Sequence, residues 1–196
     1  LVQTLYEKKL LTYPRTDSQF ITDDMEDTAR QVISIVCRQL PLFTDVSVTP
    51  DIARVTDNSK VTDHHAILPT VQLEKQDVFA LPQSEQKILN LIGMRLLCAT
   101  GEKHTYAETQ ITLSCDGYAF KTKGKTVVQN GWKAVEELFK ASLKTKEKDD
   151  PAKSLPEVHE GDVLEGVSAS ITEHFTTPPK QYTEAICCER GIRNRP

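Results

Sequence analysis

Apolar residues recur at helical spacing in the first half of the chain. One apolar face runs through residues 22–40 and consists of Met25, Ala29, Val32, Ile33, Val36 and Leu40. This spacing predicts an amphipathic helix. Thr22 can cap its start, acidic residues follow in the first turn, and Pro41 ends it.

A second helix is predicted over residues 84–99, with Gly101 as its stop. Its expected buried side consists of Ile88, Leu91, Ile92, Leu96 and Ala99. The segment between the helices, residues 41–83, is rich in Pro, Thr and Asp and predicts loops and short strands. Residues 1–9 show neither an initiator Met nor a signal-peptide pattern, and we interpret them as a chain entered mid-protein, already inside a helix.

From Tyr106 onward the pattern changes to alternation. Residues 109–115 alternate as a strand does, and Asp116-Gly117 is typical of a type I′ hairpin turn into a strand at residues 118–121. A change from helical to alternating periodicity along one chain favours the α+β fold class.

Beyond this hairpin the pattern predicts a further strand at residues 125–129 and a short amphipathic helix at residues 132–139. The mixed-charge run at residues 140–153 predicts a loop, because it cannot bury much surface. Residues 158–175 resume the strand pattern.

Composition narrows the class of protein. With 38% hydrophobic and 27% charged residues among 196, the chain is typical of globular proteins. A bilayer span needs roughly 20 apolar residues, and no such run is present, so we expect no membrane partner. The net charge of −4 provides no global basic field, so any contact with nucleic acid must be local.

The cysteines indicate the redox compartment. Their number is five, which is odd, and none are spaced as Cys-x-x-Cys. This argues against a zinc ribbon and against an extracellular disulfide framework. We therefore expect a reducing compartment.

Tyr13 and Arg15 stand two residues apart in a segment that Pro14 keeps out of a regular helix. Such a pair suits phosphate chemistry, because a phenol oxygen can attack phosphorus while a guanidinium binds the non-bridging oxygens. A packed tyrosine beside a surface arginine explains the same residues. Both interpretations stay open on these residues alone.

A second candidate site contains the adjacent histidines His64 and His65, preceded by Asp63. Neighbouring side chains on an irregular segment point in different directions, so at most one imidazole would share a site with Tyr13. Asp63 could orient one ring. A pair of ordinary loop histidines remains an alternative, and the absence of further ligands at suitable spacing argues against a metal site.

Three motifs in this order resemble the core of a type IA DNA topoisomerase, and most closely its bacterial topoisomerase III-like members. The first is Tyr-Pro-Arg-Thr-Asp-Ser at residues 13–18, preceded by Gln-Thr-Leu-Tyr-Glu at residues 3–7. The second is His-His-Ala-Ile-Leu-Pro-Thr at residues 64–70. The third, at residues 175–185, resembles the segment by which that family leaves its β-rich arch domain. The resemblance spans residues 1 to about 185.

The resemblance implies roles for particular residues. Tyr13 would attack one DNA strand and become linked to the 5′ phosphate, Arg15 would hold the scissile phosphate, and His64 would belong to the catalytic pocket. Five further positions match residues at or beside the DNA path: Gln3, Thr16, Asp17, Ser18 and His65. Single-stranded DNA is the implied partner.

The resemblance also implies a domain organisation. A helical DNA-gate domain with the tyrosine would cover residues 1–103, and part of the β-rich arch would cover residues 104–181. Residues 182–196 depart from the family pattern, and we interpret them as a truncated or frame-altered end that does not pack natively.

The implied cofactor is magnesium in the intact enzyme, without ATP. The family's metal-binding domain lies upstream of the segment matched here, so we expect no metal site in this chain and expect that domain as a partner. By itself the chain would bind single strands weakly and would not relax DNA. The implied location is the bacterial cytoplasm, associated with the nucleoid.

Two other functions stay open. The chain could be a non-catalytic module that binds single-stranded DNA on the same fold, although binding alone has no need of Tyr13, Arg15 and His64. It could also be another tyrosine-dependent strand-transfer enzyme, such as a recombinase. That mechanism uses several arginines around one phosphate, and few lie near Tyr13.

Overall fold

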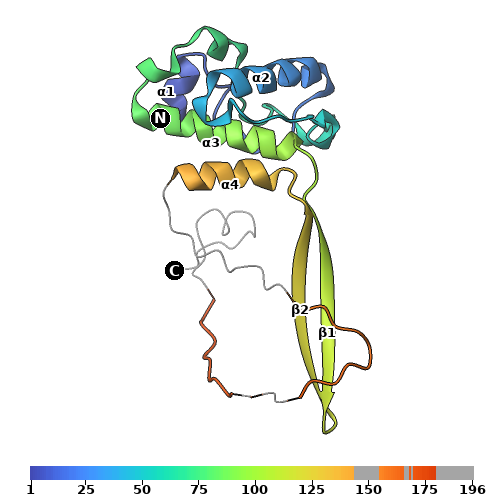
Figure 1. Ribbon diagram of the computed structural model, residues 1–196. Coiled ribbons are helices and arrows are strands. Elements are labelled where there is room, and N and C mark those ends of the chain that lie inside the picture. Colours follow the sequence, from blue (N-terminus) through green and yellow to red (C-terminus); the bar gives the residue numbers. More distant parts are fainter. Residues whose placement is uncertain (144–154, 166–167, 169, 180–196) are drawn as a thin grey trace, which may run out of the picture. The chain divides into compact units, whose positions relative to one another are not determined.

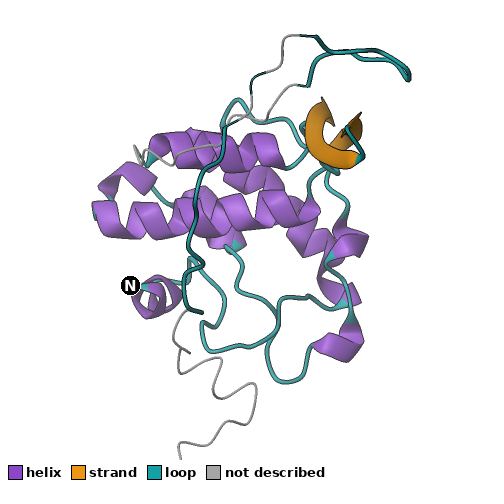
Figure 2. Cartoon of the chain, turned by 90° about the horizontal axis from the view of Figure 1, so that it is seen from below, coloured by secondary structure: helices purple, strands orange, loops and turns teal. Residues whose placement is uncertain are grey.

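A computed structural model describes residues 1–143, 155–165, 168 and 170–179. Contacts divide the chain into two compact units, residues 1–156 and residues 157–196. Helices and loops form most of the first unit, and the described residues contain strands only in one hairpin (Figures 1 and 2). Helices together with an antiparallel sheet confirm the α+β class. The domain boundary at residues 103 and 104 stays a prediction.

Four α-helices lie among the described residues of the first unit. They are α1 (Val2–Glu7), α2 (Glu26–Gln39), α3 (Gln83–Thr100) and α4 (Lys133–Ser142). The expected helical start of the chain is thus confirmed. α3 and α4 pack side by side (Figure 1).

The predicted face of α2 is confirmed. Ala29, Val32, Ile33 and Val36 are buried, and Leu40 is buried just beyond the helix. Residues Asp23–Met25 form a 3-10 turn that leads into α2. The hydroxyl of Thr22 makes no capping hydrogen bond, so the predicted cap is wrong.

The predicted face of α3 is only partly right: Leu96 is buried as predicted and Ile88 and Ile92 pack against the core, but Leu91 and Ala99 are exposed. The buried residues of α3 are Glu85, Leu89, Gly93, Met94, Leu96, Leu97 and Thr100. Apolar residues occur all around this helix, so periodicity alone selects no face. The packing is decided at Gly93, where an added Cβ would lie 2.9 Å from Leu40 Cδ1 and 3.2 Å from Val36 Cγ1.

The segment between α2 and α3 contains 3-10 turns where short strands were expected. These turns are Pro41–Phe43, Ile52–Arg54, Asn58–Lys60, Val71–Lys75 and Val78–Ala80. Three of these turns are capped by a side chain that accepts a hydrogen bond from a backbone N–H. The capping side chains are those of Asp57, Thr70 and Asp77. β pairing of this segment is limited to isolated bridges that pair Leu11 with Pro69 and Ile21 with Thr56. Local side-chain caps compete with strand pairing here.

The hairpin consists of β1 (Thr105–Cys115) and β2 (Tyr118–Gln129). Asp116 and Gly117 have φ angles of 46° and 79°, as a type I′ turn requires. The strand expected separately at residues 125–129 is the end of β2 and pairs back to the start of β1. Both strands are exposed over nearly all of their length.

Gly131 joins the hairpin to α4. It has a φ of +51°, and the next backbone N–H, of Trp132, donates to Glu102 O over 2.9 Å. α4 then buries Val135 and Phe139. The predicted short helix is therefore confirmed, and it extends three residues into the range 140–153 that was predicted as a loop.

The second unit shows no strand among its described residues, 157–165, 168 and 170–179. The expected strand at residues 158–175 is therefore wrong for the part of this range that is described. Alternation alone does not make a strand, because the backbone groups also need a partner. The interpretation of residues 182–196 as an unpacked end concerns residues outside the described part of the chain.

Candidate active site

Tyr13 lies on a segment that the preceding residues anchor to the core. Lys9 has a φ of 61° and reverses the chain after α1. Leu10 and Leu11 are then buried. Two backbone hydrogen bonds just before Tyr13 tie this segment to the one that follows His64: Thr12 N donates to Leu68 O, and Thr70 N donates to Leu10 O.

Side chains complete the link between the two segments. The hydroxyl of Thr12 accepts from Leu68 N over 2.9 Å. On the other side of Tyr13, the hydroxyl of Thr16 donates to His64 O over 2.8 Å. The Tyr-Pro-Arg-Thr motif and the His-His motif, distant in the sequence, are therefore fastened together around Tyr13.

This arrangement brings three aromatic rings into contact. The ring centroids of Tyr13 and His64 are 4.4 Å apart with an interplanar angle of 46°. Tyr6, on α1, meets Tyr13 edge to face at 5.4 Å and 78°. Tyr13 is half-buried, whereas His64 and Arg15 are exposed. The tyrosine is thus held by its neighbours next to groups that a ligand can reach.

A hollow of about 330 Å³ lies beside this stack. Its lining residues are Arg15, Thr16, Asp17, Thr62, Asp63 and His64. With the imidazole neutral, the lining carries one positive and two negative charges. Phosphate binding there would depend on the directed fork of Arg15 rather than on a general positive field.

The structure brings five of the eight predicted site residues together, namely Tyr13, Arg15, Thr16, Asp17 and His64. The other three, Gln3, Ser18 and His65, have local partners. The amide of Gln3 donates to Glu7 within α1. The Ser18 hydroxyl donates to Lys60 O, and His65 Nδ1 lies 2.7 Å from Ala66 O. Their predicted contact with DNA stays a prediction.

Sequence reasoning missed Tyr6 and Thr62. No periodicity relates Tyr6 to Tyr13, because the positive φ of Lys9 interrupts the helix between them. Thr62 enters through the same segment as His64. The ring contact of Tyr6 needed the tertiary structure to be seen.

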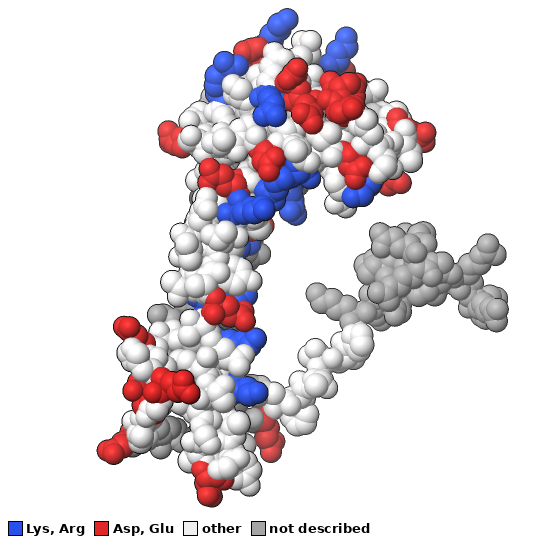
Figure 3. Space-filling view, turned by 90° about the vertical axis from the view of Figure 1, so that its right-hand side faces the viewer, with Lys and Arg blue, Asp and Glu red and all other residues white. Residues whose placement is uncertain are grey.

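The described part of the chain contains no group of three or more His, Cys, Asp or Glu residues that could hold a metal ion. It also contains no helix long and apolar enough to cross a membrane. On the face shown in Figure 3, Lys and Arg side chains are interspersed with Asp and Glu. Recognition of a polyanion on this face would therefore be local, as the net charge predicts.

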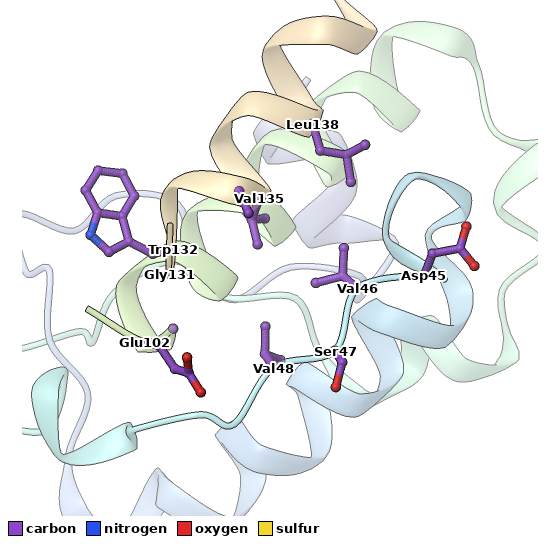
Figure 4. Close-up of a pocket in the computed structure, with 11 residues that line it drawn as sticks. Asp45, Val46, Ser47, Val48, Glu102, Gly131, Trp132, Val135 and Leu138 are labelled. Carbon is purple, nitrogen blue, oxygen red and sulfur yellow. The ribbon is translucent and has the colours of Figure 1, made fainter. Parts of the chain in front are cut away.

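A separate hollow of about 480 Å³ lies where α4 meets residues 45–48. Figure 4 shows four apolar side chains converging on it, those of Val46, Val48, Val135 and Leu138. The ring of Trp132 turns away from them (Figure 4). The charged residues that line this hollow, Asp45 and Glu102, are both acidic. An apolar hollow with acidic ends disfavours a phosphate.

Tyrosine, histidine and arginine side chains gathered in this way define a candidate site for phosphoryl transfer. The family model described as DNA topoisomerase matches residues 1–187. The chain therefore belongs to the DNA topoisomerase family, and the resemblance to bacterial type IA enzymes of the topoisomerase III kind is confirmed.

Similar proteins include DNA topoisomerase 3 of Bacillus licheniformis, 35% identical over 190 residues, and that of Bacillus subtilis, 33% identical over 190 residues. DNA topoisomerase 3 of Staphylococcus saprophyticus is 35% identical over 188 residues. These alignments cover 93–94% of the chain and 25% of each relative. The chain thus spans about a quarter of the length of these relatives.

Proposed function

We propose that this chain is the tyrosine-bearing portion of a type IA DNA topoisomerase. In this proposal Tyr13 cleaves one DNA strand through a 5′-phosphotyrosyl link and reseals it after strand passage. The contact between the rings of Tyr13 and His64, beside the hollow lined by Arg15, carries the proposal. The substrate we propose is single-stranded DNA, and the location we propose for the protein is the bacterial cytoplasm, associated with the nucleoid.

The cleavage step exchanges one ester for another. The phenol oxygen of Tyr13 forms a bond to phosphorus and loses its proton, while the bond from phosphorus to the 3′ oxygen breaks and that oxygen takes up a proton. The guanidinium of Arg15 would bind the non-bridging oxygens and stabilise the charge that builds up on them. His64 would keep the phenol ring oriented towards the phosphate.

Resealing is the reverse of this step. The 3′ hydroxyl attacks the phosphotyrosyl link, and Tyr13 leaves as the phenol. Because one phosphate ester replaces another, the link conserves the energy of the phosphodiester bond, so the cycle has no need of ATP.

Magnesium in the intact enzyme is part of this proposal. The described residues do not fit such an ion, because they contain no cluster of three potential ligands and magnesium prefers several oxygen ligands in octahedral geometry. We assign its binding to an upstream domain and derive no step through it. The isolated chain is accordingly expected to bind single strands weakly and to leave supercoiled DNA unrelaxed.

The test is a denaturing-gel assay of the full-length protein with single-stranded oligonucleotides labelled at either end. A covalent adduct that retains the 3′-side piece of the strand, and that is lost in Tyr13→Phe, is the expected result. Tyr118→Phe is a matched control, because Tyr118 lies exposed on the hairpin. An adduct that persists in Tyr13→Phe would refute the role of Tyr13.

A non-catalytic module for single-stranded DNA is the alternative that this assay separates. Such a module would bind the same oligonucleotides without forming an adduct in any variant. In that case Tyr13 would be a structural tyrosine that packs between Tyr6 and His64.

A further inference from the structure

We propose that a second hollow, on the Tyr6 side of Tyr13, binds one nucleoside of the DNA strand by stacking its base on Tyr6. This inference rests on the proposed function, since it takes the strand at Tyr13 to be DNA. It goes further by assigning a base-binding site next to the phosphate site and a residue that would hold one base of the strand in place.

The hollow has the size and position that such a site needs. It has a volume of about 620 Å³ and lies between α1, the segment leading to Tyr13 and the turn Val71–Lys75. Its lining residues are Tyr6, Glu7, Lys9, Leu11, Thr12, Tyr13, Thr70, Val71 and Gln72. Sites for ligands of nucleotide size fall in the range of roughly 300–1,000 Å³.

Tyr6 supplies an aromatic surface in this hollow. Its contact with Tyr13 is edge to face, a geometry that leaves each of the two rings with at least one face not covered by the other. The side chain of Tyr6 is 37% exposed. A partly exposed ring that is held by a neighbouring ring presents its free face to a base with little loss of rotamer freedom.

Polar groups on the rim match the rest of a nucleotide. Among the described residues, neither the amide of Gln72 nor the ammonium of Lys9 has a hydrogen-bond or ionic partner, whereas the hydroxyl of Thr70 is engaged by Lys9 O and Gln72 N. An amide can donate to and accept from a base edge. An ammonium can pair with a phosphate.

Tyr13 connects this hollow with the one that Arg15 and His64 line. Tyr13 lines the hollow on the Tyr6 side directly. It contacts the hollow on the Arg15 side through the ring of His64. A strand with its scissile phosphate at Tyr13 and Arg15 can therefore place a neighbouring base against Tyr6. The site recognises only the π surface of a base, so it binds any of the four bases better than an abasic position.

The experiment measures binding without cleavage. Full-length protein carrying Tyr13→Phe is titrated with fluorescent single-stranded oligonucleotides in which each position near the cut is replaced, in turn, by an abasic unit. The same series is repeated with Tyr6→Ala, Tyr6→Phe and Gln72→Ala added. Tyr118→Ala is the matched control for the loss of an exposed tyrosine.

We expect one abasic position to weaken binding about fivefold or more, the range that base–aromatic stacking spans. Tyr6→Ala should abolish this position effect, and Tyr6→Phe and Tyr118→Ala should retain it. An identical abasic profile with and without Tyr6 would overturn the inference, and so would equal weakening at every position. Thermal unfolding of each variant checks that it remains folded.

The adduct assay keeps the two proposals apart. If the adduct forms and Tyr6→Ala leaves the abasic profile unchanged, the nucleoside site is refuted and the cleavage proposal stands. If no adduct forms but the position effect depends on Tyr6, the nucleoside site is supported and the cleavage proposal fails.

Discussion

The ring of Tyr13 lies against the ring of His64, with 4.4 Å between their centroids. Neither residue is placed by its own secondary-structure element. The contact results from two loop segments that are fastened to each other by Leu11 and Pro69 on one side and by the Thr16 hydroxyl on the other. In the cleavage step proposed above, a tyrosine held in this way would lose little orientational freedom.

The first prediction concerns the fastening by Thr16. Its hydroxyl donates to His64 O and accepts from Ser18 N. Thr16→Val removes both hydrogen bonds, and we expect a loss of about 1 kcal/mol in the free energy of unfolding. The rate of adduct formation in the full-length protein should fall by roughly tenfold, because the position of His64 is loosened.

Thr16→Ser is the matched control, because it keeps the hydroxyl. It should behave like the unchanged protein in urea denaturation and in the adduct assay. Equal stability and equal adduct rates for the Val and Ser variants would show that the hydrogen bonds of Thr16 do not hold the site.

The second prediction concerns the ion pair that joins Lys8, the residue after α1, to α3. Lys8 Nζ donates to both carboxylate oxygens of Glu85, over 2.9 and 2.7 Å. The side chain of Glu85 is 6% exposed and that of Lys8 is 40% exposed. Lys8→Met leaves a buried carboxylate without its cation, and we expect a loss of about 2 kcal/mol, since water reaches one side of the pair.

The Lys8→Met and Glu85→Gln double variant should recover part of that stability in urea denaturation. Lys123→Met is the control, because Lys123 and its partner Glu108 are both exposed, and it should cost less than about 1 kcal/mol. If both lysine variants lose the same amount, the burial of Glu85 contributes nothing.

The third prediction compares two glycines with positive φ. At Gly131 a Cβ would lie 2.6 Å from Glu102 O and still closer to Lys103 O. At Gly117 no atom lies within 4 Å. Gly131→Ala therefore combines backbone strain with a clash against backbone, and we expect it to cost about 3 kcal/mol. Gly117→Ala should cost about 1 kcal/mol, from strain alone.

Thermal unfolding of the two variants measures this difference. Because Gly131 joins β2 to α4, its substitution should also reduce the helical signal in circular dichroism. A Gly117→Ala variant less stable than Gly131→Ala would contradict the packing described for this junction.

The fourth prediction concerns pH. Burial raises the pKa of the Cys98 thiol from 9.0 to about 11, and the carboxylate of Glu136 adds to the shift. Above pH 9 the unfolded chain loses this proton while the folded chain keeps it. The stability that Cys98 contributes is therefore complete below pH 9 and is lost as the pH rises towards 11.

Urea denaturation between pH 8 and pH 11 tests this, with Cys98→Ala as the comparison. The free energy of unfolding should fall more steeply with pH in the unchanged protein than in the variant. Parallel curves would mean that the thiol has the same pKa in both states. Lysines and tyrosines also titrate in this range, so only the difference between the two proteins is informative.

Sequence patterns identified the elements that depend on local rules. The face of α2 follows from strict periodicity, and the hairpin turn follows from Asp116-Gly117, which adopts positive φ at low cost. The motifs around Tyr13 and His64 also sufficed to indicate the family that the comparisons confirm.

The sequence by itself therefore determined the helices and the hairpin, because each depends on residues that are near one another in the chain, and its short motifs indicated the family. Only the tertiary structure decided which side of α3 is buried, where the close approach of Gly93 to Leu40 overrides an ambiguous periodicity. It also decided that Tyr6 packs on Tyr13. Contacts of this kind follow from the reversal at Lys9 and from packing between distant segments, and no local pattern encodes them.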